Sequence, residues 1–266
     1  VWFSSDAGGQ TTLYHEGVVF DSTNAIFYVK VDLSSTADTV IYLWYGLPAI
    51  TGTESKTNVW TNGKAIFHFQ ETSGDVIDSM GTFTSSTYSL SDRSETGQVG
   101  NCFNFNGSSD YIQIGSVSSF KEFHSGTDAF TIIINAQWDD YNGGDTARGA
   151  LLANTGTISE TGIIFFLDSY SSYDDTVRLF TCYSANPSYV AYYDSPTNAV
   201  PDNDWNLYSV RASATTVYVD VNGVNLGNTT NGTGTTNNAT DELMVGRTNY
   251  SSAELWFDGK IGSVWI

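Results

Sequence analysis

The sequence predicts an all-β fold, a sandwich or jelly roll built from many short strands. Short stretches alternate apolar and polar residues, are rich in β-branched and aromatic side chains, and are separated by turn residues. No segment longer than about ten residues has a helical period or a capped apolar stripe. Long exact repeats are absent, which argues against a propeller or solenoid. Frequent turns and few helices therefore favour a sandwich over an α/β fold.

The clearest alternation marks the expected strands in chain order. These strands are Ile26–Val31, Val40–Tyr45, Ala65–Phe69, Tyr111–Ile114, Ile163–Leu167, Val177–Tyr183, Leu207–Arg211, Val217–Val221 and Leu255–Ile266. Asn222-Gly223 predicts a type I′ hairpin turn, because both central residues of that turn need positive φ. The segment Thr72–Gly100 is rich in Ser, Thr and Gly, and we expect a long surface excursion there.

The sequence contains a candidate linker between a smaller N-terminal β-unit and the rest of the chain. Pro48–Ser55 has the composition of a connection, which places a boundary near residues 55–64. We therefore expect an N-terminal β-unit over residues 1–58 and a larger sandwich over residues 64–266. The chain opens at Val1 inside what reads as a strand, so we expect a piece of something longer.

Composition excludes several classes of partner. The 266 residues are 40% hydrophobic and 14% aromatic, as in a globular protein, and long enough for a sizeable core. Ten Lys and Arg stand against 29 Asp and Glu, a net charge of −19 that repels nucleic acid. The longest apolar runs fall far short of the roughly 20 residues of a membrane span.

The two cysteines lie in apolar alternating stretches. Cys102 and Cys182 are predicted to be buried thiols, with a disulfide between them left open as the alternative. Their number is too low for a disulfide scaffold.

Ordered motifs in the larger unit carry a family resemblance. Ala65–Gly74 with Asp78–Gly81, and Asn104–Ile112, look like the opening strands and turns of laminin-G-like jelly rolls. Further pieces follow in the family's order: Phe130–Ile132, Trp205–Tyr208, Tyr218–Gly223, Leu243–Gly246 and Phe257–Gly262. The chain from about residue 64 to its end therefore resembles a laminin-G-like, concanavalin-A-like jelly-roll domain. The resemblance implies an extracellular binding module.

The N-terminal unit resembles a second, uncharacterised β-domain family. That family often precedes such jelly rolls in bacterial, archaeal and phage surface proteins. The residues that carry the resemblance are Val1–Phe3 with Asp6, Phe27–Val31 and Val40–Gly46. Earlier strands normally stand before the position of Val1, which implies a truncated N-terminal domain over residues 1–58.

Residue patterns argue against catalysis. Glycosidases of the concanavalin-like fold place two carboxylates on one strand in a Glu-x-Asp-x-x-Glu arrangement, a spacing that does not occur here. Adjacent pairs such as Asp139-Asp140 point to opposite faces of a strand. His15, His68 and His124 are scattered and form no metalloprotease or hydrolase motif. We therefore predict that the chain is not an enzyme.

Aromatic and acidic residues concentrate at candidate carbohydrate sites. Sugars stack their apolar ring faces on aromatic side chains, while their hydroxyls meet carboxylates and amides. The predicted ligand-binding residues are Trp138, Asp140 and Tyr141 in one stretch, Asp168, Tyr170, Tyr173 and Asp174 in a second, and Tyr192. Tyrosine is also an ordinary half-buried strand residue, so a purely structural role for these side chains is the competing interpretation.

Calcium is the ion that the resemblance implies, held by carboxylates and carbonyls at a loop rim. The positions that match the pentraxin branch hold Glu160 and Asn249, a departure that puts its double-calcium site in doubt. Asp110 and Asp258 belong to the jelly-roll signatures, with turn stabilisation as their first expected role and structural calcium as their second.

Together these observations predict a non-catalytic extracellular binding or adhesion module that recognises carbohydrate. The alternative is a structural protein of a virion or surface filament, with the sandwich mediating assembly. A carbohydrate-active enzyme whose catalytic domain lies outside this chain is a third possibility. The expected partners are a glycan, a surface protein or copies of the chain, at the cell surface, the virion surface or outside the cell.

Overall fold

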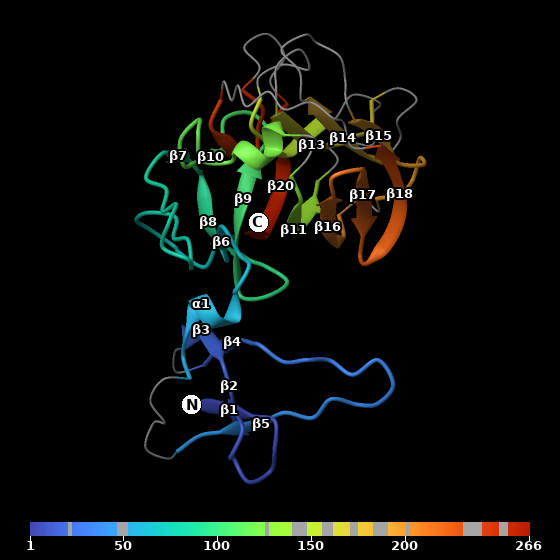
Figure 1. Cartoon of the computed structure of the whole chain (residues 1–266). Coiled ribbons are helices and arrows are strands. Elements are labelled where there is room, and N and C mark those ends of the chain that lie inside the picture. Colours follow the sequence, from blue (N-terminus) through green and yellow to red (C-terminus); the bar gives the residue numbers. More distant parts are fainter. Residues whose placement is uncertain are drawn as a thin grey trace.

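A computed structural model describes residues 1–20, 23–46, 53–125, 128–139, 148–155, 162–170, 175–182, 191–200, 203–230, 241–249 and 255–266. Of Phe20, His124, Cys182 and Ala191 only the backbone is described. Figure 1 shows a large β-sandwich above a small N-terminal β-unit. The predicted fold class, an all-β sandwich of the jelly-roll kind with a smaller N-terminal unit, is confirmed. No helix within the described ranges is long and apolar enough to cross a membrane.

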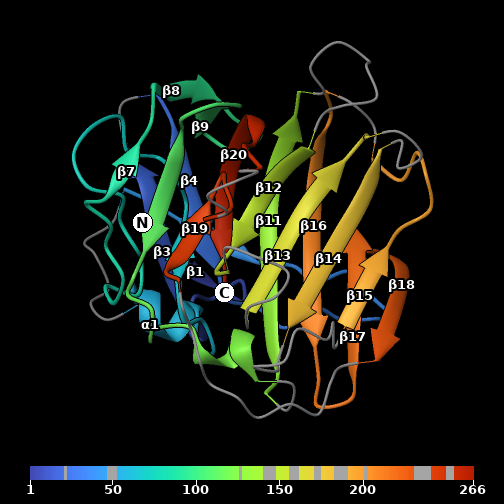
Figure 2. The same ribbon diagram turned by 90° about the horizontal axis from the view of Figure 1, so that it is seen from above.

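Two large sheets form the sandwich, and the strands paired within them are antiparallel. The seven-stranded sheet has the order β15 (Ala191–Asp194), β14 (Thr176–Cys182), β13 (Gly162–Asp168), β12 (Arg148–Ala153), β19 (Leu243–Val245), β10 (Tyr111–Ile114) and β7 (Tyr88–Ser89). The eight-stranded sheet has the order β18 (Val224–Thr230), β17 (Thr216–Val221), β16 (Trp205–Ala212), β11 (Phe130–Trp138), β20 (Asp258–Trp265), β9 (Asn101–Asn106) and β8 (Asp92–Thr96), and β6 (Ile66–Phe67) pairs with β20. In Figure 2 the strands β13, β14 and β15 overlie β11, β16 and β17.

The N-terminal unit contains two small sheets. One has the order β2 (Thr12–Leu13), β1 (Trp2–Ser4) and β5 (Tyr42–Trp44), and the other pairs β3 (His15–Phe20) with β4 (Ala25–Val29). The short helix α1 (Lys56–Val59) connects this unit to the sandwich, and a 3-10 turn, η1 (Lys121–His124), precedes β11. The division into domains at residues 1–58 and 64–266 stays a prediction.

Strand alternation creates the core between the two large sheets. On β11 every second side chain from Phe130 to Trp138 is buried in the main apolar cluster. The same cluster contains Ile163, Phe165 and Leu167 of β13. The alternate residues, Ile164, Phe166 and Asp168, therefore lie on the opposite face of the sheet. This opposite, outer face of the seven-stranded sheet carries the candidate site described below.

Two sequence expectations for local structure have clear outcomes. Asn222 and Gly223 have φ of 53° and 76°, as the predicted type I′ turn requires, and they join β17 to β18. The expected surface excursion at Thr72–Gly100 is wrong in part, because it contains β7 and β8. These polar strands form because they hydrogen-bond at sheet edges, where an alternating apolar pattern is not needed.

Cys102 is a free, buried thiol in β9. Its burial raises the pKa of the thiol to about 11, which keeps it protonated and unreactive at neutral pH. Cys102 therefore fits the first of the two predicted states, whereas the side chain of Cys182 lies outside the described part of the chain.

A buried carboxylate joins the N-terminal unit to the sandwich. Glu16 of β3 is 1% exposed and accepts hydrogen bonds from Trp60 Nε1 at 2.6 Å and Ser79 Oγ at 2.6 Å. The Nε2 atom of His68 lies 3.2 Å from the same carboxylate. Tyr28 of β4 stacks on the His68 ring, with 4.5 Å between the ring centroids. Charge and aromatic contacts therefore fix the two units against each other.

Candidate binding site on the outer sheet face

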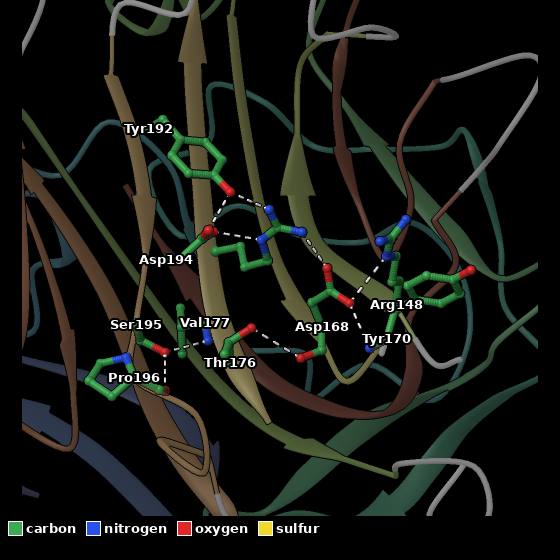
Figure 3. Close-up of polar contacts among 10 residues, drawn as sticks. Arg148, Asp168, Tyr170, Thr176, Val177, Tyr192, Asp194, Ser195 and Pro196 are labelled. Atoms are coloured by element: carbon green, nitrogen blue, oxygen red, sulfur yellow. Dashed lines mark hydrogen bonds and ion pairs between the residues drawn. The ribbon is translucent and has the colours of Figure 1, made fainter. Parts of the chain in front are cut away.

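The candidate site lies on the outer face of β12, β13, β14 and β15. Because Val177 and Leu179 point into the core, Arg178 between them points outward. The same alternation turns Asp168 and Asp194 to this face, where the side chains meet. We call Arg148, Asp168, Tyr170, Arg178, Tyr192 and Asp194 the arginine–tyrosine cluster; Figure 3 shows their contacts.

Asp168 is the acceptor at the centre of the cluster and is fully buried. Its Oδ2 accepts a hydrogen bond from Arg178 Nη1 at 2.5 Å, and its Oδ1 accepts one from Arg148 Nε at 3.1 Å. The backbone N–H of Tyr170 donates to the same Oδ1 at 2.8 Å. A buried carboxylate with two guanidinium partners is compensated, so it holds the strand ends in place.

Arg178 links Asp168 to the second carboxylate and to a tyrosine. Its Nε donates to Asp194 Oδ1 at 2.6 Å, and its Nη2 donates to the Tyr192 hydroxyl at 2.5 Å. That hydroxyl donates in turn to Asp194. Burial acts against the charge of Arg178, but the hydrogen bonds that Arg178 donates to Asp194 and Asp168 outweigh it and raise the pKa of the guanidinium.

Aromatic rings cover the buried guanidinium. The Arg178 Cζ lies 5.2 Å from the ring centroids of Phe166 and Phe180 and 5.6 Å from that of Tyr192. Phe180 and Tyr192 also stack on each other, with 4.8 Å between their centroids. Burial and the bond to Asp194 raise the pKa of the Tyr192 hydroxyl, so it stays neutral and can donate a hydrogen bond.

Two tyrosines and one arginine of the cluster remain open to solvent. Tyr170 is 46% exposed and Tyr192 is 40% exposed. The Arg148 side chain is 36% exposed, and its Cζ lies 4.5 Å from the centroid of the Tyr170 ring. The cluster therefore presents aromatic rings and hydrogen-bonding groups on a rigid support, the combination that sugar binding needs.

A further arginine, Arg247, stacks on two aromatic rings beside the other half of the same sheet. Tyr111 of β10 points outward, since its neighbour Ile112 is in the core. The Arg247 Cζ lies 3.9 Å from the Tyr111 centroid and 5.3 Å from that of Trp256. This array repeats the arginine-on-aromatic arrangement.

The structure brings some of the predicted ligand-binding residues together. Asp168, Tyr170 and Tyr192 meet in the cluster, with Asp168 in a supporting role because no part of it reaches solvent. Trp138 was predicted to bind ligand, but it is 1% exposed and lies in the core. The inward alternation of β11 continues to this last residue of the strand. The remaining four lie outside the described residues: Asp140, Tyr141, Tyr173 and Asp174.

Sequence reasoning missed Arg148, Arg178 and Asp194. The available signal was a charged residue between two apolar ones, as in Val177-Arg178-Leu179, which places that charge on the outer face of a buried strand. In a chain with ten basic residues, a strand-borne arginine is notable.

The predicted calcium ligands have other partners or lie outside the described residues. Asp110 is 2% exposed and accepts from Ser91 N at 3.1 Å and Ser91 Oγ at 2.5 Å, a turn-stabilising role. Asn249 donates to Asp241 at 3.2 Å. Burial and the neighbouring charge of Asp139 raise the pKa of Asp258. Glu160 is outside the described part, and within that part no three His, Cys, Asp or Glu side chains form a metal-binding group.

No family model matches the sequence, and no curated protein matches it. Solved structures do share the fold. One is domain 4 of AbnA, an extracellular GH43 arabinanase from Geobacillus stearothermophilus in complex with arabinotriose: 17% identity, 76% of this chain and 90% of that chain covered, TM-score 0.51. A mutant Trypanosoma rangeli sialidase displaying trans-sialidase activity has 12% identity, 76% and 30% coverage, and TM-score 0.51. At these identities the likeness establishes the β-sandwich fold.

Proposed function

We propose that this chain is a non-catalytic carbohydrate-binding module whose ligand contacts the arginine–tyrosine cluster. The observation that carries the proposal is the pair of half-exposed tyrosines, Tyr170 and Tyr192, held on one sheet face by buried ion pairs. Preorganised aromatic rings bind sugars at a low entropic cost. The fold shared with domain 4 of the arabinanase, whose structure contains arabinotriose, supports the proposal.

The chemistry of the cluster favours binding over catalysis. Both oxygens of Asp168 accept from guanidinium groups, and Asp194 is held by Arg178 and Tyr192. Carboxylates engaged in this way are not placed to transfer a proton to a glycosidic oxygen. As a surface-binding module, the protein would act outside the cell, on a cell surface or on a virion.

A glycan array tests this proposal. We expect the purified chain to bind at least one glycan and Tyr170→Ala to weaken that binding about fivefold, since a stacked ring contributes about 1 kcal/mol. The matched control is Tyr218→Ala, because Tyr218 also lies under an arginine, Arg211, at 5.0 Å, but on the eight-stranded sheet. Absence of binding across the array, or equal losses in both variants, would count against the proposal.

A role in assembly is the second candidate, and the N-terminal unit offers the observation that favours it. Strand β5 is at a sheet edge, and the exposed apolar residues Val40, Ile41, Leu43 and Tyr45 lie on or beside it. An open apolar edge can pair with another chain. Sedimentation velocity from 1 to about 100 μM separates the candidates: a binding module stays monomeric, whereas an assembly subunit forms larger species.

Calcium remains a proposal for the rim near Asp258. Burial and, after it, the carboxylate of Asp139 raise the pKa of Asp258, and a divalent cation would relieve the repulsion between the two carboxylates. We expect 1 mM calcium to raise the melting temperature, chelator to reverse the shift and Asp258→Asn to abolish it, with the exposed Asp204→Asn as control. Equal melting with calcium and with chelator would exclude a structural ion.

A further inference from the structure

Arg148 has hydrogen-bonding capacity that the fold leaves unused. Its Nε donates to Asp168, and neither terminal nitrogen donates to another group of the protein within the described ranges. By contrast, Arg178 uses Nε and both terminal nitrogens. The side chain of Arg148 is 36% exposed, so the edge that carries Nη1 and Nη2 is open to a ligand.

The guanidinium of Arg148 is also held in place. Asp168, which is fully buried, anchors it through Nε, and the Tyr170 ring supports it at 4.5 Å. The fork of two parallel N–H groups matches the two oxygens of a carboxylate, and a fixed fork loses little freedom on binding. The half-exposed Tyr170 ring lies beside it and offers a surface for an apolar sugar face.

Local charge permits an anionic ligand here despite the acidity of the chain. Two guanidinium groups, of Arg148 and Arg178, balance the carboxylates of Asp168 and Asp194. The cluster is therefore neutral on a protein of net charge −19. Four of the five arginines stack over aromatic residues of this sheet or its adjoining segments: Arg93, Arg148, Arg178 and Arg247.

We infer that the ligand is an acidic sugar, a uronic or sialic acid, whose carboxylate is bound by the free edge of Arg148 while its ring packs on Tyr170. This inference rests on the proposed carbohydrate-binding function and specifies its substrate class. A neutral sugar would leave the charged fork without a matching anion.

Paired probes that differ only in the acidic group test the inference. Titration calorimetry would compare α2,3-sialyllactose with its carboxyl methyl ester, and trigalacturonate with its fully methyl-esterified form. We expect one acidic probe to bind at least about tenfold more tightly than its neutral partner, because a charge-assisted hydrogen bond is worth more than a neutral one. That affinity should fall as salt rises.

Arg148→Gln removes the charge and the fork, and we expect it to abolish the preference for the acidic probe. Arg148→Lys keeps the charge but not the fork and should retain part of the preference. Arg211→Gln is the matched control, since Arg211 is 49% exposed, is paired with Asp220 and is stacked on Tyr218 on the other sheet. The comparison of acidic and neutral probes uses the unaltered protein, so its result does not depend on whether a variant folds.

Three other results would each contradict a different part of the proposal. Equal affinity for acidic and neutral partners would overturn the acidic-sugar inference and leave carbohydrate binding standing. A hexaglutamate peptide that binds as tightly as the acidic sugars would show general anion binding and overturn the sugar assignment. No binding to any of these sugars, with no binding on the wider glycan array, would overturn both the inference and the proposed function.

Discussion

Arg178 is the side chain on which the arginine–tyrosine cluster depends most. It is 8% exposed, and it holds Asp168, Asp194 and Tyr192 at the same time. A buried ion pair contributes little net stability while intact, but removing one partner leaves a buried charge without compensation. The cluster is therefore a rigid support that tolerates change at its exposed rim and not at its centre.

Replacement of the buried arginine tests this role. We expect Arg178→Met to lower the free energy of unfolding by about 3 kcal/mol, because Asp168 keeps only Arg148 and Asp194 loses its ion pair. Arg211→Met on the other sheet should cost less, about 1 kcal/mol, because Arg211 is 49% exposed and the buried Asp220 keeps hydrogen bonds from Ser209 and Asn225. Urea unfolding measures both, and equal losses would mean that Arg178 is not a structural centre.

At the scale of the element, the alternation of apolar and polar residues is the sequence signal that predicted most of the strands. Tyr111–Ile114 coincides with β10, and the prediction at Val177–Tyr183 differs from β14 by one residue at each end. The strands that were missed, such as β8 and β12, have no regular alternation, because one is a polar edge strand and the other contains a bulge.

The candidate site was predictable only in part, because local alternation does not show which strands pair with each other. Tyr170 and Tyr192 were identified by residue type, whereas their arginine partners required knowledge of which strands are neighbours. Asp168 and Arg178 are ten positions apart in the chain and meet because β13 and β14 pair. No local pattern specifies such a pairing.

The β17–β18 turn offers a test of an element that the sequence did specify. Gly223 has φ of 76°, and no atom lies near a Cβ placed there, so a substitution introduces backbone strain without a clash. We expect Gly223→Val to cost about 1 to 2 kcal/mol and Gly223→Asn clearly less, because Asn tolerates this conformation. Thermal melting distinguishes them, and a neutral Val variant would argue against the turn type.

At the scale of the whole molecule, Glu16 couples the N-terminal unit to the sandwich. Burial alone would raise the pKa of Glu16, but hydrogen bonds from His68, Ser79 and Trp60 outweigh it and lower the pKa to about 2. Because the folded pKa lies below the unfolded value of 4.5, this stabilisation is present above about pH 4.5. It is lost as the pH falls towards 2.

The pH dependence of unfolding measures this coupling. We expect the protein to lose up to about 3 kcal/mol more than Glu16→Gln between pH 5 and pH 2, because the variant has no carboxylate to protonate at this position. The other carboxylates titrate in both proteins, so the difference isolates Glu16. Parallel stability curves would show that its ionisation does not contribute.

Arginine side-chain NMR shows whether the outer face of the seven-stranded sheet binds the ligand. The protein has five arginines, and their Nε–Hε signals report on both sheets. The titrants are α2,3-sialyllactose and trigalacturonate. We predict that the one that binds shifts the Arg148 signal and leaves that of Arg211 in place. A shift at Arg211 with Arg148 unmoved would mean that the ligand binds the eight-stranded sheet and not the arginine–tyrosine cluster.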